Sequence, residues 1–259
     1  MLEIRNLICG YAGAVIEGFS VDVAPGEALC ILGRNGIGKT TLFRTLLGTL
    51  PPLSGEVLFG GADLFSMPRR EKAEKLAYVP QSHNPPFAYT ALDIVLMGRA
   101  GLMSAFSLPS ARDREMARSA METLGISDLE GRAYTKVSGG ERQMILIARA
   151  LAQGADFLFL DEPAANLDYG NQMRVLRVMR DLAASGKGIV FTSHDPGHAL
   201  LLGAKAAAIH AKDGFRIGAA DDVVTKEMAG ELYGVRAEVV EVFDAERGGH
   251  VKVFAPFLD

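Results

Sequence analysis

The sequence predicts an α/β fold with a mostly parallel sheet, and three observations support this prediction. A glycine-rich stretch, residues 33–41, stands between an apolar run and a segment of helical composition. Two further apolar runs, residues 157–160 and 188–193, are typical of buried parallel strands. Residues 2–8 alternate in part between apolar and polar side chains, and residues 15–23 alternate clearly. This alternation indicates an antiparallel β subdomain at the N-terminal side.

Composition limits the class of protein. The chain has 259 residues, of which 49% are hydrophobic and 22% are charged, so it can bury a substantial core without disulfides or a structural metal. The net charge is −4 and no long basic run occurs, which argues against nucleic acid as the main partner.

Cysteine use and the absence of long apolar segments bear on the compartment. Cys9 and Cys30 lie in apolar runs without metal-ligand spacing, and we expect both to be small buried hydrophobes in a reducing compartment. No apolar window of about 18 residues occurs, so no membrane span is expected. Residues 1–5 lack the pattern of a signal peptide. We expect a cytoplasmic protein, or one peripheral on the cytosolic face of the inner or cell membrane.

The glycine-rich stretch has the pattern of a phosphate-binding P-loop and defines a P-loop NTPase core. Its glycines let successive N–H groups point at phosphate oxygens, and the following helix adds partial positive charge at its N-terminus. Lys39 is expected over the β- and γ-phosphates, and the Thr40 hydroxyl is expected to complete the shell of a Mg²⁺ ion. The expected nucleotide-binding residues of the loop are Gly33, Arg34, Asn35, Gly36, Ile37, Gly38, Lys39, Thr40 and Thr41.

The remaining elements follow from periodicity and turn residues. Further helices are predicted at residues 68–75, 90–97 with Thr90 as N-cap, 111–124, 144–151, 172–183 and 225–233. Further strands are predicted at residues 55–61, 76–79, 205–210, 215–217, 235–243 and 251–254.

A second potential anion site precedes the helix at residues 144–151. Ser138, Gly139 and Gly140 stand at its N-terminal side, and a serine with two glycines at a helix N-terminus can bind an anion. A single nucleotide does not need both sites from the same molecule.

Two adjacent carboxylates end the apolar run at residues 157–160. Asp161 can hold Mg²⁺ through water, and Glu162 can polarise the attacking water as a general base. A capping acid pair in a loop is the alternative interpretation, and the P-loop in the same chain favours the catalytic one.

Three further residues have both an ordinary and a functional interpretation. Gln81 follows the strand at residues 76–79, where α/β folds bind ligands, and it is an ordinary loop residue or a sensor of Mg²⁺ and the γ-phosphate. His194 ends the run at residues 188–193 and is a structural histidine or a hydrogen-bond partner of the γ-phosphate. Tyr11 is a solvent-edge tyrosine or a ring on which adenine stacks, and spacing alone leaves both open.

The order of these motifs from Tyr11 to His194 resembles that of the nucleotide-binding subunit of an ABC transporter. The Ser-Gly-Gly signature before the acidic strand distinguishes such ATPases from other P-loop proteins. The resemblance implies binding and hydrolysis of ATP with Mg²⁺. It assigns adenine stacking to Tyr11, the Q-loop to Gln81, the signature to residues 138–143, the D-loop acid to Asp168 and the switch histidine to His194. Thr40, Gln81 and Asp161 are then the expected magnesium ligands, and Glu162, His194 and Gln81 the expected catalytic residues.

The resemblance also accounts for two anion sites in one chain. Subunits of this family pack head to tail, with ATP between the P-loop of one copy and the signature of the other. Ser138, Gly139, Gly140 and Glu141 are then expected at the ATP bound by a second copy. Two signature positions depart from the family, since Val137 stands where Leu is usual and Glu141 stands where Gln is often found.

Two segments resemble the subfamily that powers importers of metal chelates. Residues 86–99 and 224–235 are similar to subunits serving ferric siderophores, haem, cobalamin, and molybdate or tungstate. This resemblance implies a partner permease dimer in the membrane, docking near residues 82–108, and indirectly a substrate-binding protein. The expected organisation is an ATPase domain at residues 1–220, with a helical signature subdomain at about 85–155, and a small C-terminal tail lobe at 221–259 that is no independent domain.

Other ABC proteins offer alternative functions. A soluble ATPase of iron–sulfur cluster assembly is compatible with the chain length, although the apolar segment at residues 99–106 favours a membrane partner. DNA-repair members carry a long coiled-coil insertion between the P-loop and the signature, and translation factors usually carry two cassettes. Neither feature is present in this sequence.

Overall fold

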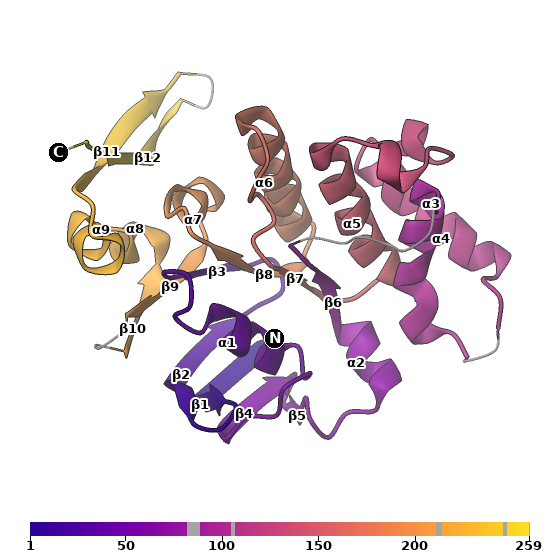
Figure 1. Ribbon diagram of the computed structural model, residues 1–259, viewed down its shortest axis with the longest axis horizontal. Coiled ribbons are helices and arrows are strands. Elements are labelled where there is room, and N and C mark those ends of the chain that lie inside the picture. The colour runs from indigo at the N-terminus through magenta and orange to yellow at the C-terminus, as the bar shows by residue number, and fades with distance from the viewer. Residues whose placement is uncertain (82–88, 105–106, 211–213, 246–247, 259) are drawn as a thin grey trace. The chain divides into compact units, whose positions relative to one another are not determined.

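A computed structural model describes residues 1–81, 89–104, 107–210, 214–245 and 248–258 (Figure 1). The chain divides into two compact units, each described by itself below. Unit 1 contains residues 1–66 and 179–259, and unit 2 contains residues 67–178.

The parallel strands of unit 1 surround one buried strand. β3 (Ala28–Leu32) has no exposed residue, and it pairs in parallel with β8 (Gly188–Ser193) on one side and β9 (Lys205–His210) on the other. β10 (Gly214–Ala219) adds an antiparallel edge to β9. Strands buried on both faces need apolar side chains throughout, which is why these segments read as continuous hydrophobic runs. The predicted α/β class with a mostly parallel sheet is confirmed.

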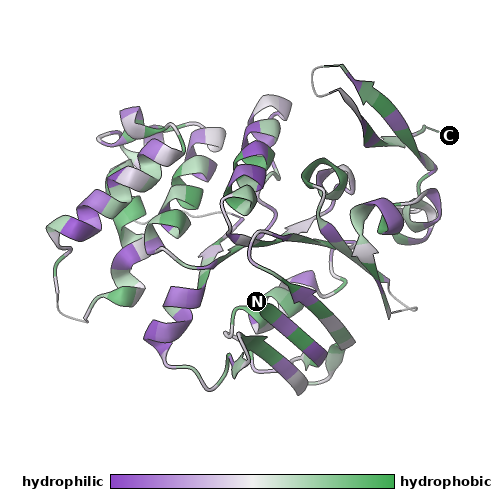
Figure 2. Cartoon of the chain, turned by 180° about the vertical axis from the view of Figure 1, so that it is seen from behind, coloured by the Kyte–Doolittle hydropathy of each residue, from purple (hydrophilic) through white to green (hydrophobic). Residues whose placement is uncertain are grey.

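An antiparallel sheet forms the N-terminal part of unit 1. Its order is β2 (Ala14–Val23), β1 (Leu2–Gly10), β4 (Ser54–Phe59) and β5 (Ala62–Asp63). Hydrophobic and hydrophilic residues are interspersed along these strands in Figure 2. The apolar side chains meet across the pairs, as at Ile4 opposite Val21. Phe19 also contacts Phe215 edge to face, with 5.2 Å between ring centroids. The predicted antiparallel subdomain is confirmed.

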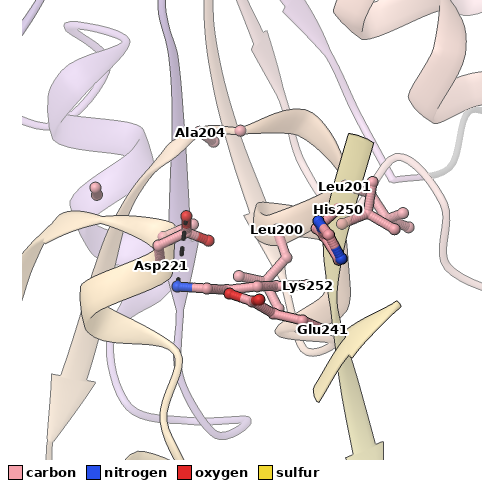
Figure 3. Close-up of a pocket in the computed structure, with 11 residues that line it drawn as sticks. Leu200, Leu201, Ala204, Asp221, Glu241, His250 and Lys252 are labelled. Atoms are coloured by element: carbon pink, nitrogen blue, oxygen red, sulfur yellow. Dashed lines mark ion pairs between the residues drawn. The ribbon is translucent and has the colours of Figure 1, made fainter. Parts of the chain in front are cut away.

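The C-terminal residues complete unit 1. They form α8 (Ala220–Val223), α9 (Lys226–Tyr233) and a hairpin of β11 (Ala237–Asp244) and β12 (Gly249–Pro256). The predicted helix at 225–233 and the two predicted strands are confirmed. α7 (Gly197–Leu202), which the sequence analysis missed, packs against β12. A cavity of about 360 Å³ lies beside this contact, with Leu200, Leu201 and His250 among its lining residues (Figure 3).

Unit 2 combines a strand pair with helices. β6 (Leu76–Val79) and β7 (Phe157–Leu160) are parallel. The helices are α2 (Arg69–Lys75), α3 (Ala91–Leu96), η1 (Met97–Leu102), α4 (Ala111–Thr123), η2 (Ser127–Leu129), η3 (Tyr134–Lys136), α5 (Gly139–Gln153) and the first part of α6 (Tyr169–Ala184). α3, α4 and η1 pack around the apolar face of α5.

Capping boxes begin three helices of unit 2. Thr90, Ser110 and Ser138 each accept a hydrogen bond from the backbone three residues later, and the side chain at that later position accepts from the cap residue in return. This reciprocal pairing satisfies two backbone donors that a helix start otherwise leaves unpaired. The predicted N-cap Thr90 is confirmed.

Arg99 joins three helices of unit 2. Its Nε donates to Asp113 on α4 at 3.0 Å, and its Nη1 donates to the last carbonyls of α5, those of Ala152 and Gln153, at 3.0 Å each. The Ser110 hydroxyl, Arg99 and the Ser110 backbone together lower the pKa of Asp113 to about 2. This carboxylate therefore stays charged and bound to Arg99 at neutral pH.

The predicted docking segment near 82–108 is described only in part. Residues 82–88 and 105–106 lie outside the described residues. They include residues 86–88 of the stretch that resembles metal-chelate importers, and the end of the apolar segment 99–106. Within the described ranges, no helix has the length and apolar character needed to cross a bilayer.

η1 and α5 approach each other closely at Gly98, and a substitution there tests the packing of unit 2. A Cβ atom on Gly98 would lie 2.0 Å from the carbonyl oxygen of Arg149, which belongs to the backbone and cannot move aside cheaply. We therefore expect Gly98→Ala to lower the free energy of unfolding by about 1–3 kcal/mol, the usual cost of overpacking. Urea unfolding followed by circular dichroism measures this change.

The matched control is Gly131→Ala in the same unit. Gly131 has no atom within 4 Å of an added Cβ. Its substitution should leave the stability within about 0.5 kcal/mol. Equal stability of the two variants would contradict the packing described here.

Candidate functional site

The glycine-rich loop of unit 1 leaves the end of buried strand β3 and leads into α1 (Lys39–Leu46). Gly36 and Gly38 have φ angles of 82° and 110°, values that favour glycine. Gly38 is the N-cap of α1, and a Cβ there would lie 2.6 Å from Val15. Both the backbone path and the close approach of β2 therefore require glycine at this position.

Lys39 is held inside this loop. Its Nζ donates to the carbonyl oxygens of Gly33 at 2.6 Å and Arg34 at 3.2 Å, and the residue is only 7% exposed. Thr40, the next residue, is exposed. The first turn of α1 contains no acidic side chain, so its partial positive charge is not offset locally. The loop thus presents the groups that an anion such as a phosphate prefers.

Tyr11 lies in the loop between β1 and β2 and is 59% exposed. Its hydroxyl oxygen accepts a hydrogen bond of 2.8 Å from Arg44 on α1. An exposed ring that is fixed at one end to the P-loop helix fits a stacking surface, and the role of Tyr11 toward adenine stays a prediction. The sequence analysis missed Arg44, because a contact across 33 positions has no local signal.

The cysteines and Tyr233 lie behind the loop, in the interior of unit 1. Cys9 and Cys30 are buried and free, as predicted, and burial raises the pKa of both thiols. Burial also raises the pKa of Tyr233 on α9, with smaller contributions from Cys30 and Asp195. These groups stay protonated at neutral pH, so no reactive thiolate lies under the phosphate-binding loop.

His194 follows the last residue of β8 and is exposed. Its neighbours Ser193 and His198 are buried, with exposed fractions of 4% and 7%. The predicted switch histidine is therefore at the carboxyl end of a parallel strand of unit 1, the position where α/β sheets bind ligands.

The acid pair of unit 2 follows β7. The N–H of Asp161 donates to the carbonyl of Val79 at 2.9 Å, which continues the pairing of β6 and β7. Glu162 has a φ of 45°, uncommon for a residue with a side chain. Its carboxylate accepts a hydrogen bond of 3.1 Å from the Gln81 amide. The structure thus brings together two predicted catalytic residues that are 81 positions apart.

The signature residues begin α5 in unit 2. Ser138 is the N-cap, and its N–H donates to the Glu141 carboxylate at 2.7 Å. Arg132 donates to the other oxygen of Glu141 at 3.0 Å. The hydrogen bonds from Ser138, backbone first, lower the pKa of Glu141. Both carboxylate oxygens of Glu141 therefore have partners in this chain.

Asp168 and Gly140 are connected through Asn171. Asp168 accepts hydrogen bonds from the backbone and the side chain of Asn171 at 2.9 and 2.6 Å, and these bonds lower its pKa. A Cβ on Gly140 would lie 2.2 Å from the side-chain oxygen of Asn171. The predicted D-loop acid and the signature glycine therefore share one neighbour, which the sequence analysis missed.

The oxygen donors suit a magnesium ion that is bound mainly by phosphates. No group of three His, Cys, Asp or Glu residues with metal-binding geometry occurs among the described residues. Thr40 in unit 1 offers a hydroxyl oxygen, and Gln81 and Asp161 in unit 2 offer amide and carboxylate oxygens. Mg²⁺ usually combines one or two protein ligands of this kind with phosphate oxygens and water.

Comparisons with known proteins agree with these features. The family model described as ABC transporter matches residues 16–165. The molybdate import ATP-binding protein MolC of Haemophilus influenzae is 36% identical over 235 residues, which cover 90% of this chain and 87% of that protein. The hemin import ATP-binding protein HmuV of Gloeobacter violaceus is 36% identical over 250 residues, which cover 93% and 90%. A solved structure described as an inward-facing conformation of a metal-chelate type ABC transporter matches with a TM-score of 0.87 and 32% identity, covering 99% of this chain and 97% of that one.

Replacing the loop lysine tests the phosphate-binding assignment. Lys39→Ala removes the ammonium group that is held by the loop carbonyls, and a charge-assisted contact to phosphate contributes about 1.5–3 kcal/mol. We expect the ATP dissociation constant to rise at least tenfold, measured by titration with a fluorescent ATP analogue. Lys226→Ala, at an exposed position on α9, is the control and should bind ATP normally. Unchanged affinity of the Lys39 variant would exclude this loop as the triphosphate site.

Proposed function

Because the chain belongs to the ABC transporter family and is an ATP hydrolase of that family, we propose that it energises import of a metal chelate or metal oxyanion through a separate membrane permease. The observation that carries this proposal is similarity over at least nine-tenths of the chain to a molybdate and a hemin import subunit. The similar solved structure, also of metal-chelate type, supports the same cargo class.

The catalytic step is assigned to Glu162. Its carboxylate is the base that takes a proton from the water attacking the γ-phosphate, while the Gln81 amide, 3.1 Å away, holds it in place. A residue in a strained backbone conformation keeps one orientation only if its surroundings fix it, and the hydrogen bond from Gln81 serves that purpose. His194 contributes a hydrogen bond to the γ-phosphate.

Nucleotide and metal are bound by separate sets of residues. The P-loop amides and Lys39 bind the phosphates, and Tyr11 stacks on adenine. Thr40, Gln81 and, through water, Asp161 hold Mg²⁺. When bound, this ion neutralises charge that develops on the β- and γ-phosphates.

Two copies of the chain enclose two ATP molecules. The start of α5 provides Ser138, Gly139 and Gly140 as a second anion site, and its occupant is the γ-phosphate of the ATP bound to the P-loop of a second copy. Closure of the two copies around ATP then requires bound ATP, and hydrolysis lets the dimer reopen.

The permease binds unit 2 near residues 82–108. Two apolar residues of this region, Leu108 and Met97, are 88% and 37% exposed, so their side chains are accessible to a partner. Such docking places the chain at the cytosolic face of the membrane. A substrate-binding protein delivers the cargo to the permease and does not contact this chain.

The alternative function, a soluble ATPase of iron–sulfur cluster assembly, has no support in the similar proteins named above. Both named relatives are import subunits. The discriminating experiment is reconstitution of the chain with the permease that co-purifies with it, in vesicles loaded with ATP. We expect ATP-dependent uptake of a ferric chelate, haem or molybdate. If ATP does not increase the uptake of any of the three, the import function is refuted.

The catalytic assignment makes a prediction about Glu162→Gln. This change removes the base but keeps the size of the side chain, so ATP hydrolysis should fall at least about 100-fold while ATP affinity stays within a factor of about two. The variant should also accumulate as a dimer in ATP, measured by light scattering.

Glu130→Gln is the matched control for Glu162→Gln. It removes the same charge from unit 2 at a partly exposed residue whose partner is Arg118 at 2.8 Å. Its hydrolysis rate should equal that of the unmodified chain. Normal hydrolysis by the Glu162 variant would show that another group is the base.

Permease docking predicts the effect of Leu108→Asp. A charge placed in an apolar contact weakens binding, and we expect affinity for the permease in detergent to fall at least tenfold, which corresponds to about 1.4 kcal/mol. ATP hydrolysis by the chain alone should not change. Leu53→Asp is the control at another exposed leucine, in unit 1. Equal loss of permease binding in both variants would place the docking surface elsewhere.

A further inference from the structure

A closed set of polar contacts surrounds the backbone of His194. The Ser193 hydroxyl oxygen accepts a hydrogen bond from the N–H of Asp195 at 3.0 Å and lies 3.0 Å from Nδ1 of His198. The Asp195 carboxylate accepts a hydrogen bond from the N–H of Gly197 at 2.8 Å. The residue on each side of His194 is therefore linked to the first turn of α7.

His198 is at the centre of these contacts. Its ring is buried, and its Nε2 lies 3.5 Å from the Asp195 carboxylate. Among the described residues, Nε2 has no hydrogen-bond partner within normal distance. The ring thus lies between the hydroxyl of Ser193 and the carboxylate of Asp195, the two neighbours of His194 in the chain.

The surroundings of the ring favour its neutral form. Burial lowers the pKa of His198, the Asp195 carboxylate raises it, and His194 lowers it, with a net decrease, so the ring is neutral at pH 7. The Ser193 hydroxyl donates to the carbonyl oxygen of Asp195 at 3.1 Å, and its oxygen also lies 3.0 Å from Nδ1 of His198. Ser193 therefore joins the His198 ring to the backbone on the C-terminal side of His194.

We propose that His198 is a positioning residue for ATP hydrolysis: through Ser193 and Asp195 it fixes the backbone of His194 and so the direction in which His194 points. The inference rests on the role of His194 given under Proposed function. His198 is not a catalytic residue in this proposal, because its two ring nitrogens face Ser193 and Asp195 of its own chain.

An open pocket borders α7 apart from these contacts. Leu200 and Leu201 of α7 and His250 of β12 line the cavity of about 360 Å³ (Figure 3). α7 begins at Gly197, three residues after His194, and the hydrogen bonds of Ser193 and Asp195 tie the segment between them to the first turn of α7.

The experiment is a double-mutant cycle on the full-length chain, with the turnover number, KM and ATP affinity measured for each variant. His194→Ala, His198→Ala and the double variant form the cycle. We expect His198→Ala to lower turnover about tenfold with KM and ATP affinity within about twofold, because a misplaced group affects the chemical step. In the His194→Ala background, the same change should have no further effect.

Two conservative variants and one control separate positioning from loss of folding. His198→Asn keeps a polar side chain that can hydrogen-bond Ser193 and should recover most of the turnover, whereas Ser193→Ala removes the hydroxyl that contacts the ring and should match His198→Ala. His210→Asn is the control, because it removes another histidine of unit 1 whose Nδ1 lies 3.7 Å from Glu231. Its turnover should not change.

Two results identify which statement fails. If His194→Ala hydrolyses ATP normally, the proposed role of His194 is wrong. If His194→Ala is impaired, but the loss caused by His198→Ala is just as large in its background, or His198→Asn is no better than His198→Ala, then His198 acts independently of His194 and the inference is overturned.

Discussion

The burial of β3 is the constraint on which the phosphate-binding loop depends. This strand has neighbours on both edges and no exposed residue, so its last residue, Leu32, has a fixed position. The loop begins at the next residue, and its conformation is set by Gly36 and Gly38 together with the contacts of Lys39 to the loop carbonyls. A buried parallel strand followed by such a loop orients the backbone amides before any phosphate is bound, which reduces the cost of ordering them on binding.

The two units carry different parts of the chemistry, and each part is supported by its own hydrogen bonds. Unit 1 carries the P-loop and His194, and buried polar contacts around Ser193 support the latter. Unit 2 carries the acid pair and the signature, with Glu162 bound by Gln81 and the signature glycine packed against Asn171. Tyr11, Thr40 and His194, which we propose approach the nucleotide, are exposed, whereas Lys39 is buried and held by loop carbonyls.

The sequence predicted features that depend on local patterns and missed those that depend on distant contacts. The P-loop, the Thr90 cap and the buried strands follow from composition over a few residues, and the structure has them. α6 begins at Tyr169, three residues before the predicted start, because Asp168 caps it through Asn171. α7 was missed because six residues between a proline and a glycine are too few to show helical periodicity.

Contacts such as that of Gln81 with Glu162 or of Tyr11 with Arg44 join positions far apart in the chain, and no local pattern specifies them. The departure at Glu141 shows how such a contact changes the interpretation of a motif. A carboxylate at the third residue of α5 caps the helix well, yet it adds negative charge where a phosphate is expected to bind. Arg132, 3.0 Å from that carboxylate, offsets the added charge within the same unit. The exchange of the family's usual glutamine for Glu141 is therefore accompanied by a cation that keeps the start of α5 suitable for an anion.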